Sequence, residues 1–374
     1  MRSHPLRNGM RVALLAACCL APAQVATVRA SVAPQQQPQP AALSAAAPAS
    51  PEIERGVRLF RQNDVKGAVK AFRAATKRRK DDPVPWLYLS QALALTGDLK
   101  EALKANGNSL RLDPNFAAAH ADHALIMMLS EKSTEAEASA ARALQLDPGL
   151  AEAHYVLGMI HLRAGAWLKA AEEADAIIKL NDRFAPAYTL KAQALLGLFE
   201  RGAEIIRDER RGAFDYNQQT LAEVEAAQPA RLSEAADSLE KYLRVLPGAR
   251  DAEHVRMQIE SLRFYARTGR RGHLGPGDVI HSSSELTRKA HITSRPHPSF
   301  TEEARRAGTT GFVRLRAVLA WDGTVKHIMV LKSLPHGLTE RAVAAARQIK
   351  FVPARAGETP VSQWVVIEYG FRVY

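Results

Sequence analysis

The chain has 374 residues, of which 47% are hydrophobic and 24% are charged. This balance is typical of a globular protein, excludes collagen-like or wholly disordered structure, and indicates about two or three domains of roughly 150 residues. The net charge of +12 at pH 7 permits an acidic partner, whether nucleic acid, anionic lipid or an acidic protein face, without selecting one. The only two cysteines, Cys18 and Cys19, are adjacent, which excludes a disulfide scaffold, a zinc cage and an iron–sulfur site.

Residues 1–30 predict a signal peptide. Basic residues near the N-terminus precede an apolar run over 12–23, which is shorter than the roughly 20 residues needed to cross a bilayer. Small residues before position 31 fit cleavage there, which is the route we favour. Two alternatives stay open. Cys18 follows a Leu-Ala-Ala segment that resembles a lipobox and would carry a lipid anchor, or the apolar run is retained uncleaved in the membrane.

Residues 31–51 form a spacer rich in Ala, Pro and Gln. They lack the large apolar residues that would offset the entropy of ordering, so we expect a disordered and fairly extended segment. Simple cleavage of the leader would leave a mature chain without cysteine, whose stability would owe nothing to disulfides.

A repeat with a period of 34 residues follows the spacer. Positions that recur at this spacing include Trp86, His120, His154 and Tyr188, and also Ala102, Ala136 and Ala170. Small residues let paired helices approach closely, and proline after aspartate ends one unit and starts the next. The pattern resembles the tetratricopeptide repeat, which implies two antiparallel helices per unit stacked into a solenoid.

After residue 199 the period breaks. Pro229 is expected to interrupt the charged helical segment over 200–228, and amphipathic patterns predict helices over 231–245 and 251–268. We assign residues 52–268 to one helical repeat domain, whose divergent last hairpins cap the stack.

Repeats of this type present a concave surface, which implies a groove for a peptide segment of a protein partner. The positions expected on that surface are Gln91, Leu125, Met128, Tyr155, Met159, Arg163 and Gln193. The alternative for these side chains is that they only pack neighbouring helices together, since the fold alone does not establish a function.

A different pattern begins near the C-terminal end. Residues 269–290 are rich in Gly, Pro and Ser and predict a linker to a second domain over 291–374. The expected fold class is therefore a multidomain α+β protein, with an all-α helical-hairpin solenoid followed by a small α+β domain.

The second domain is predicted to be a three-stranded antiparallel sheet covered by a helix. Alternating residues predict a strand over 312–321, with Trp321 on its apolar face, and Asp322-Gly323 predicts a hairpin turn to a strand over 325–331. Thr301 is expected to cap a short helix. An apolar stripe predicts a helix over 338–349, and alternation returns from 363 to 374.

Several short segments of this domain occur in a characteristic order. They include the run from Pro298 to Arg305, the Asp322-Gly323-Thr324-Val325 turn, and Phe351-Val352-Pro353-Ala354. On these residues the chain from about 292 onward resembles the C-terminal domain of the TonB family of energy transducers. In that family the domain binds outer-membrane receptors, a receptor segment adds to its sheet as an extra strand, and inner-membrane proton flow is coupled to transport. The resemblance implies a periplasmic or cell-envelope location.

The final strand is the expected docking edge, because an extended peptide can satisfy unpaired N–H and C=O groups there. The residues expected to contact a partner are Val365, Val366, Ile367, Glu368, Tyr369, Phe371 and Arg372. From residue 291 onward there are twelve Lys and Arg against six Asp and Glu, which favours an acidic partner segment. Exposed edges also make a paired or swapped dimer an open alternative.

Two features depart from the TonB resemblance. The apolar leader is short, and the spacer before the repeats is much shorter than the proline-rich rod of an energy transducer. We therefore favour an exported adaptor, which holds a receptor or other envelope protein by strand addition while the repeats recruit a second protein. The alternatives are a genuine transducer anchored in the inner membrane, and a structural envelope protein that binds cell-wall polymer.

The chemistry of an enzyme or a cofactor site is not expected. His120, His123 and His154 lie close in the repeat pattern, but no carboxylate or cysteine completes a metal-ligand set of recognised spacing. The glycines from 269 to 275 are not followed by Lys-Ser or Lys-Thr, so they do not form a phosphate-binding loop. We therefore predict no catalytic residues, no metal, no cofactor and no nucleic-acid partner.

Overall fold

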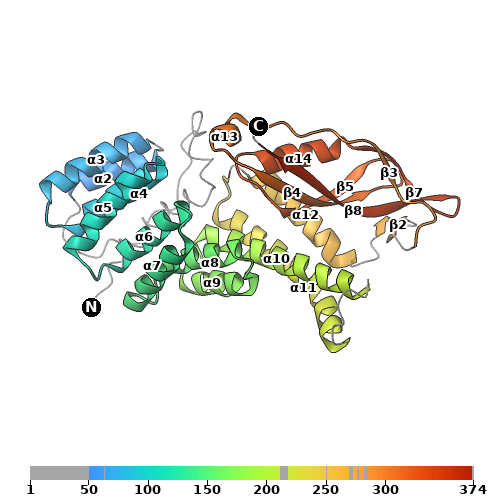
Figure 1. Ribbon diagram of the computed structural model, residues 1–374, viewed down its shortest axis with the longest axis horizontal. Coiled ribbons are helices and arrows are strands. Elements are labelled where there is room, and N and C mark those ends of the chain that lie inside the picture. Colours follow the sequence, from blue (N-terminus) through green and yellow to red (C-terminus); the bar gives the residue numbers. More distant parts are fainter. Residues whose placement is uncertain are drawn as a thin grey trace. The chain divides into compact units, whose positions relative to one another are not determined.

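The computed structural model describes residues 50–62, 64–210, 218–249, 251–268, 273–275, 278–281 and 285–372 (Figure 1). The expected signal peptide, nearly all of the spacer, and Cys18 with its expected lipidation lie outside these residues. The chain divides between Ala187 and Tyr188 into two compact units.

The first unit is a series of helical hairpins, drawn from blue to green in Figure 1. Aspartates begin several helices: Asp64 accepts a hydrogen bond from the Gly67 N–H, and Asp82 accepts one from the Val84 N–H. These helices are α2 (Pro51–Arg61), α3 (Val65–Arg78), α4 (Pro83–Leu95), α5 (Leu99–Leu112), α6 (Ala117–Leu129), α7 (Ser133–Leu146), α8 (Ala151–Arg163) and α9 (Trp167–Leu180). They confirm the expected paired helices.

Small side chains at the repeated positions allow the paired helices to pack closely. Ala102, Ala136 and Ala170 are completely buried. Two helices also approach closely at Gly56, where an added Cβ would lie 2.4 Å from the Phe72 ring. The backbones in this unit therefore come near enough that a larger residue at these positions would displace a neighbour.

Buried polar groups join neighbouring hairpins of the first unit. The Ser90 hydroxyl of α4 donates to Asp122 Oδ2 of α6 at 2.6 Å, and the Asn106 amide of α5 donates to the same oxygen at 2.9 Å. All three side chains are buried. Because a buried polar group is costly without a partner, these bonds specify the alignment of α4, α5 and α6.

The second unit begins with three long helices, which are α10 (Ala185–Arg210, which starts just before the division), α11 (Gln218–Val245) and α12 (Ala252–Thr268). The expectation that Pro229 interrupts a helix is wrong, because Pro229 lies inside α11. A proline there costs about 3 kcal/mol through a lost hydrogen bond and a steric clash. Burial of Leu232, Ala235 and Leu239 on the helix offsets that cost.

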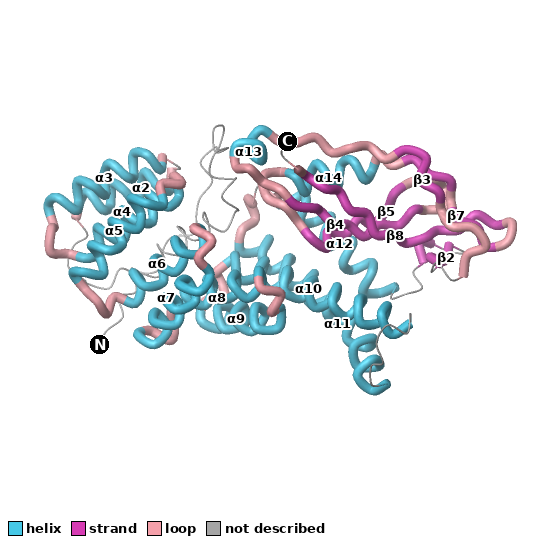
Figure 2. The backbone as a smooth tube through the Cα atoms, in the orientation of Figure 1, coloured by secondary structure: helices cyan, strands magenta, loops and turns pink. Residues whose placement is uncertain are grey.

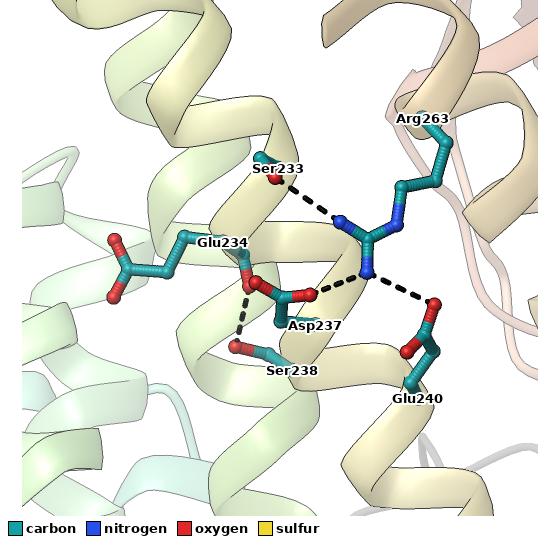
Figure 3. Close-up of polar contacts among 6 residues, drawn as sticks. All are labelled: Ser233, Glu234, Asp237, Ser238, Glu240 and Arg263. Carbon is teal, nitrogen blue, oxygen red and sulfur yellow. Dashed lines mark hydrogen bonds and ion pairs between the residues drawn. The ribbon is translucent and has the colours of Figure 1, made fainter.

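One arginine ties α12 to α11 (Figure 3). The Arg263 guanidinium donates to Ser233 Oγ at 3.1 Å and to Glu240 Oε1 at 3.1 Å, and it also bonds the Asp237 carboxylate. Glu234, also on α11, pairs with Lys191 of α10 at 2.6 Å. The three helices are thus joined by ion pairs as well as by apolar packing.

The central sheet contains β4 (Gly311–Leu319), β5 (Val325–Lys332) and β8 (Thr359–Phe371). β4 lies between β8 and β5 and is antiparallel to both, which confirms the expected three-stranded antiparallel sheet. Gly323 adopts φ +80° in the turn between β4 and β5, a conformation that glycine reaches without strain.

Short strands not expected from the sequence extend this core (Figure 2). β2 (Asp278–His281) runs parallel to β8 and pairs with β1 (His273–Gly275), while β7 (Ala354–Ala356) forms a hairpin with the start of β8. β3 (His291–Ser294) and β6 (Lys350–Val352) make a separate two-stranded sheet. β1 and β2 both fall within the range 269–290.

One face of the sheet is covered by α14 (Leu338–Arg347), as expected. Leu315 and Leu319 are completely buried in this core, and α13 (Glu302–Arg306) is capped by Thr301, which accepts a hydrogen bond from the Ala304 N–H. The expectation that Trp321 shares the apolar face is wrong. Trp321 follows the end of β4, where the chain enters the turn, and is 51% exposed.

Candidate partner-binding surface

The C-terminal part of β8 has an edge without a neighbouring strand. β8 pairs with β4 from Gln363 to Phe371. On its other side β8 pairs with β2 at Ser362 and Gln363, and its pairing with β7 involves only residues 359–361. Within the part of the chain that the structure describes, residues 364–371 therefore have a strand on one side only. We call this stretch the open edge.

One contact shows which backbone groups face outward along the open edge. The Glu368 carbonyl accepts a hydrogen bond from the Arg295 guanidinium, so it points away from β4. In an antiparallel pair the N–H and C=O of one residue point to the same side, and successive residues alternate. The register with β4 has no irregularity here. The backbone groups of Val366, Glu368 and Gly370 therefore face the open side.

The expected docking residues divide between the two faces of β8. Val366 (44% exposed) and Glu368 point outward, and Arg372 is exposed just beyond the strand. The residues that face the core are Val365, which is half-buried, and Ile367, Tyr369 and Phe371, which are buried. The buried side chains hold β8 in place, so a partner would meet backbone groups and the outward residues.

The charges beside the open edge are mostly positive. Glu368 is held by Arg314 at 2.6 Å, and Arg314 also pairs with Glu200 of α10 at 3.2 Å. Burial raises the pKa of Glu200, and the bond with Arg314 counteracts only part of that shift. Because the Glu368 carboxylate is already paired, the cations Arg295 and Arg372 set the local field.

The opposite edge of the sheet is covered by α12. Gln258 makes two hydrogen bonds with Val330 of β5: its amide nitrogen donates to the carbonyl at 3.1 Å, and its oxygen accepts from the N–H at 2.9 Å. Ser261 donates to the Ile328 carbonyl at 3.1 Å. The helix thus replaces a missing strand, which is one way in which proteins protect a sheet edge.

A bulge in β5 completes this α12–β5 contact. Tyr265 donates to the His327 carbonyl at 3.0 Å, and the Phe264 ring stacks on the His327 ring with centroids 3.6 Å apart. His327 has φ +47°, an unusual value for a residue other than glycine, at the place where the β4–β5 register shifts. Burial lowers the pKa of His327.

The side chain of Arg316 lies among aromatic rings on the face of the sheet away from α14. Its guanidinium carbon is 4.5 Å from the Trp364 ring centroid, 4.8 Å from that of Tyr265 and 5.7 Å from that of Phe199. Its Nε is buried without a hydrogen-bond partner, and burial lowers the pKa of the group. Cation–π attraction offsets part of this desolvation. In the sequence Arg316 alternates with apolar residues, which is typical of the solvent-facing side of a strand, so the pattern carries no signal for this burial.

The expected groove residues differ in accessibility. Arg163 and Gln193 are exposed and Met159 is half-buried, and the Arg163 guanidinium donates to the Met128 carbonyl at 3.1 Å. The buried positions are Gln91, Leu125, Met128 and Tyr155. Gln193 belongs to the second unit and the other six to the first. That these residues line a peptide groove stays a prediction.

Comparisons with known families match both parts of the chain. The family described as "Gram-negative bacterial TonB protein C-terminal" matches residues 296–373, and a tetratricopeptide repeat family matches residues 53–117 and 130–188. The chain combines tetratricopeptide repeats with a TonB C-terminal domain. Both families are generally non-enzymatic, and the expectation that this chain is not an enzyme stays a prediction.

Several solved structures are similar to part of this chain. The MamA protein is 19% identical with a TM-score of 0.34, and covers 54% of this chain and 93% of its own. The thermophilic tetratricopeptide protein TTC0263 of Thermus thermophilus is 17% identical with a TM-score of 0.43, covering 56% and 96%. YrrB, described as having an unusual peptide-binding site, is 19% identical with a TM-score of 0.32, covering 50% and 98%. No curated protein matches the sequence.

Neither a metal cluster nor a membrane-spanning helix is found among the described residues. No group of three His, Cys, Asp or Glu side chains there could hold a metal ion. No helix in the same residues is long and apolar enough to cross a bilayer. Three histidines of the tetratricopeptide repeats contact other protein groups. The His120 and His154 rings contact the carbonyls of Pro114 and Pro148, at equivalent places in adjacent units, and His123 Nδ1 contacts Ser139 Oγ.

The tetratricopeptide repeats should lose some stability as the pH rises above 6.5. His154 Nδ1 lies 2.6 Å from Glu173 Oε2, and this bond raises the pKa of His154 above its ordinary value. The stabilisation is fully present below the unfolded pKa of about 6.5 and is lost as the pH passes through the higher folded pKa. For this half-buried pair we expect about 0.5–1 kcal/mol.

Urea unfolding of wild type and Glu173→Gln between pH 5.5 and 8.5 measures this effect. The variant should remove the part of the stability difference that depends on His154 ionisation. An equal stability difference between the two proteins at both ends of this range would contradict the prediction.

Proposed function

We propose that this chain is an exported cell-envelope adaptor that binds an extended segment of another envelope protein by β-strand addition at the open edge. The observation that carries the proposal is the stretch over 364–371, which pairs with β4 alone among the strands of the described residues and directs alternate backbone groups outward. An added strand satisfies those groups without requiring any catalytic side chain. The TonB C-terminal match supports an envelope or periplasmic location and an outer-membrane receptor as partner.

The tetratricopeptide repeats are proposed to recruit a second protein through the seven groove residues predicted above. Support comes from the repeat family, whose stacked hairpins provide an extended surface. Of the members in the first unit, the exposed Arg163 and the half-buried Met159 would meet a peptide first. The buried members would shape the surface beneath it.

Photo-crosslinking in intact Gram-negative cells tests strand addition. A photoreactive residue at Glu368 should crosslink a partner, because this side chain points outward on the open edge. The same residue at Arg341, exposed on α14, serves as a positional control and should capture none. Equal capture from both positions, or none from position 368, would argue against docking at this edge.

A proline variant sharpens that experiment. The Val366 N–H faces the open side, so Val366→Pro removes a docking donor but no hydrogen bond to β4. We expect Val366→Pro to keep the circular dichroism spectrum of the wild type. Crosslinking from position 368 should fall at least tenfold, because the lost hydrogen bond to the partner and the fixed φ of proline weaken strand pairing. Unchanged crosslinking in this folded variant would show that the edge is not the docking site.

A further inference from the structure

The open edge is partly occupied by the protein itself. The segment over 295–300, which links β3 to α13, contacts the end of β8 at two places. Arg295 donates to the Glu368 carbonyl and lies 4.6 Å above the Tyr369 ring, and Phe300 packs edge-on against Phe371 with centroids 5.5 Å apart. The Phe300 end is anchored in the core, whereas Arg295 is exposed. Because Arg295 follows directly on β3, which pairs with β6, its exposed guanidinium rather than its backbone is the part that a partner would displace.

This arrangement creates a competition for one acceptor. A partner strand that pairs along residues 364–371 needs the Glu368 carbonyl for one of its own N–H groups. That carbonyl already accepts a charge-assisted hydrogen bond from Arg295. A partner strand must therefore displace the Arg295 guanidinium, and the displaced cation then needs a new acceptor.

Among the residues that the structure describes, no carboxylate forms an ion pair with Arg295. Glu368, the nearest acid in sequence to the contact, is held by Arg314 at 2.6 Å. Arg372 adds a second positive charge next to the same strand end. A carboxylate on the partner would supply what is missing, because a guanidinium binds a carboxylate through two parallel hydrogen bonds more strongly than it binds a neutral carbonyl.

We propose that Arg295 is a specificity residue of the open edge, which blocks the Glu368 carbonyl in the free protein and selects extended partners that carry an Asp or Glu near the position paired with Glu368. The proposal rests on the strand-addition function stated above. It assigns two effects to one side chain: exclusion of neutral strands and attraction of acidic ones.

Two synthetic peptides test this proposal with the full chain. The probes are a blocked, fluorescein-labelled heptapeptide, Thr-Val-Glu-Val-Glu-Val-Thr, and its counterpart with glutamine in place of glutamate. By fluorescence anisotropy the wild type should bind the glutamate peptide about tenfold more tightly, and this preference should shrink as salt is raised. Arg295→Gln should lose the preference and should bind the glutamine peptide at least as tightly as the wild type does.

Matched variants separate Arg295 from general charge. Arg306→Gln removes an exposed arginine of α13 and should leave the preference unchanged. Arg295→Lys keeps the charge without the planar fork and should retain a reduced preference.

Failure of the specificity role and failure of strand addition give different results. Equal binding of both peptides by the wild type, or an undiminished preference in Arg295→Gln, would overturn the specificity role alone. Failure of both peptides to bind the wild type and Arg295→Gln would overturn strand addition itself.

Discussion

Gln258→Ala is expected to lower the free energy of unfolding of the second unit by about 2–4 kcal/mol, because it leaves the Val330 N–H and C=O without partners beneath α12. The Gln258 side chain is buried and makes both bonds, so truncation exposes two backbone groups at once. Urea unfolding of the full chain measures the loss. Hydrogen-exchange mass spectrometry should show faster exchange of the Val330 amide than in the wild type.

The matched control for Gln258 is Arg256→Ala in the same helix. Arg256 is exposed, so its replacement should change stability by less than about 0.5 kcal/mol and leave the Val330 amide protected. A loss of stability in Gln258→Ala no larger than that of the control would show that the helix does not hold this edge.

The Gln258→Ala variant should also self-associate. An uncovered β5 presents unpaired backbone groups, which are a template for pairing between copies. Size-exclusion chromatography at increasing concentration should therefore show larger species for Gln258→Ala than for Arg256→Ala.

Two substitutions of Arg316 should differ strongly in their effect on stability. Arg316→Ala is expected to cost about 2–4 kcal/mol, because it leaves a void among Phe199, Tyr265 and Trp364 and removes their cation–π contacts. Arg316→Met fills most of that space and removes a buried charge whose Nε has no acceptor. Replacing a poorly compensated buried charge by an apolar group is often neutral or stabilising, so we expect a change within about 1 kcal/mol.

Urea unfolding of both Arg316 variants beside the wild type checks this expectation. Methionine and alanine variants of equal instability would mean that the cation itself, rather than the volume it fills, holds α10 and α12 against the sheet.

Periodic patterns made most of the fold predictable. The spacing of Ala102, Ala136 and Ala170 indicated paired helices, because a repeat reports the same local packing several times. Alternation likewise located β4 and β8, since one face of each is buried. The prediction for Pro229 was wrong because the free-energy cost of a proline inside a helix is outweighed by packing further along α11.

The details of the binding surface could not be predicted from periodicity. The bonds from Gln258 to Val330 join residues far apart in the chain, and neither sequence segment shows a pattern that predicts the contact. The aromatic surroundings of Arg316 come from three separate elements, α10, α12 and β8. The hydrogen bond from Arg295 to the Glu368 carbonyl also has no sequence signal, because Arg295 lies in an irregular segment without a periodic pattern.

The contact between α12 and β5 limits how the TonB C-terminal domain can be fused to another protein. A fragment cut at the start of the family match would keep β8 but leave behind Gln258, Ser261 and Tyr265, and with them the cover of β5. Such a fragment would expose the edge of β5 in addition to the open edge of β8. The compact unit that begins at Tyr188 contains both the sheet and this covering helix, so a fragment cut there keeps the two together.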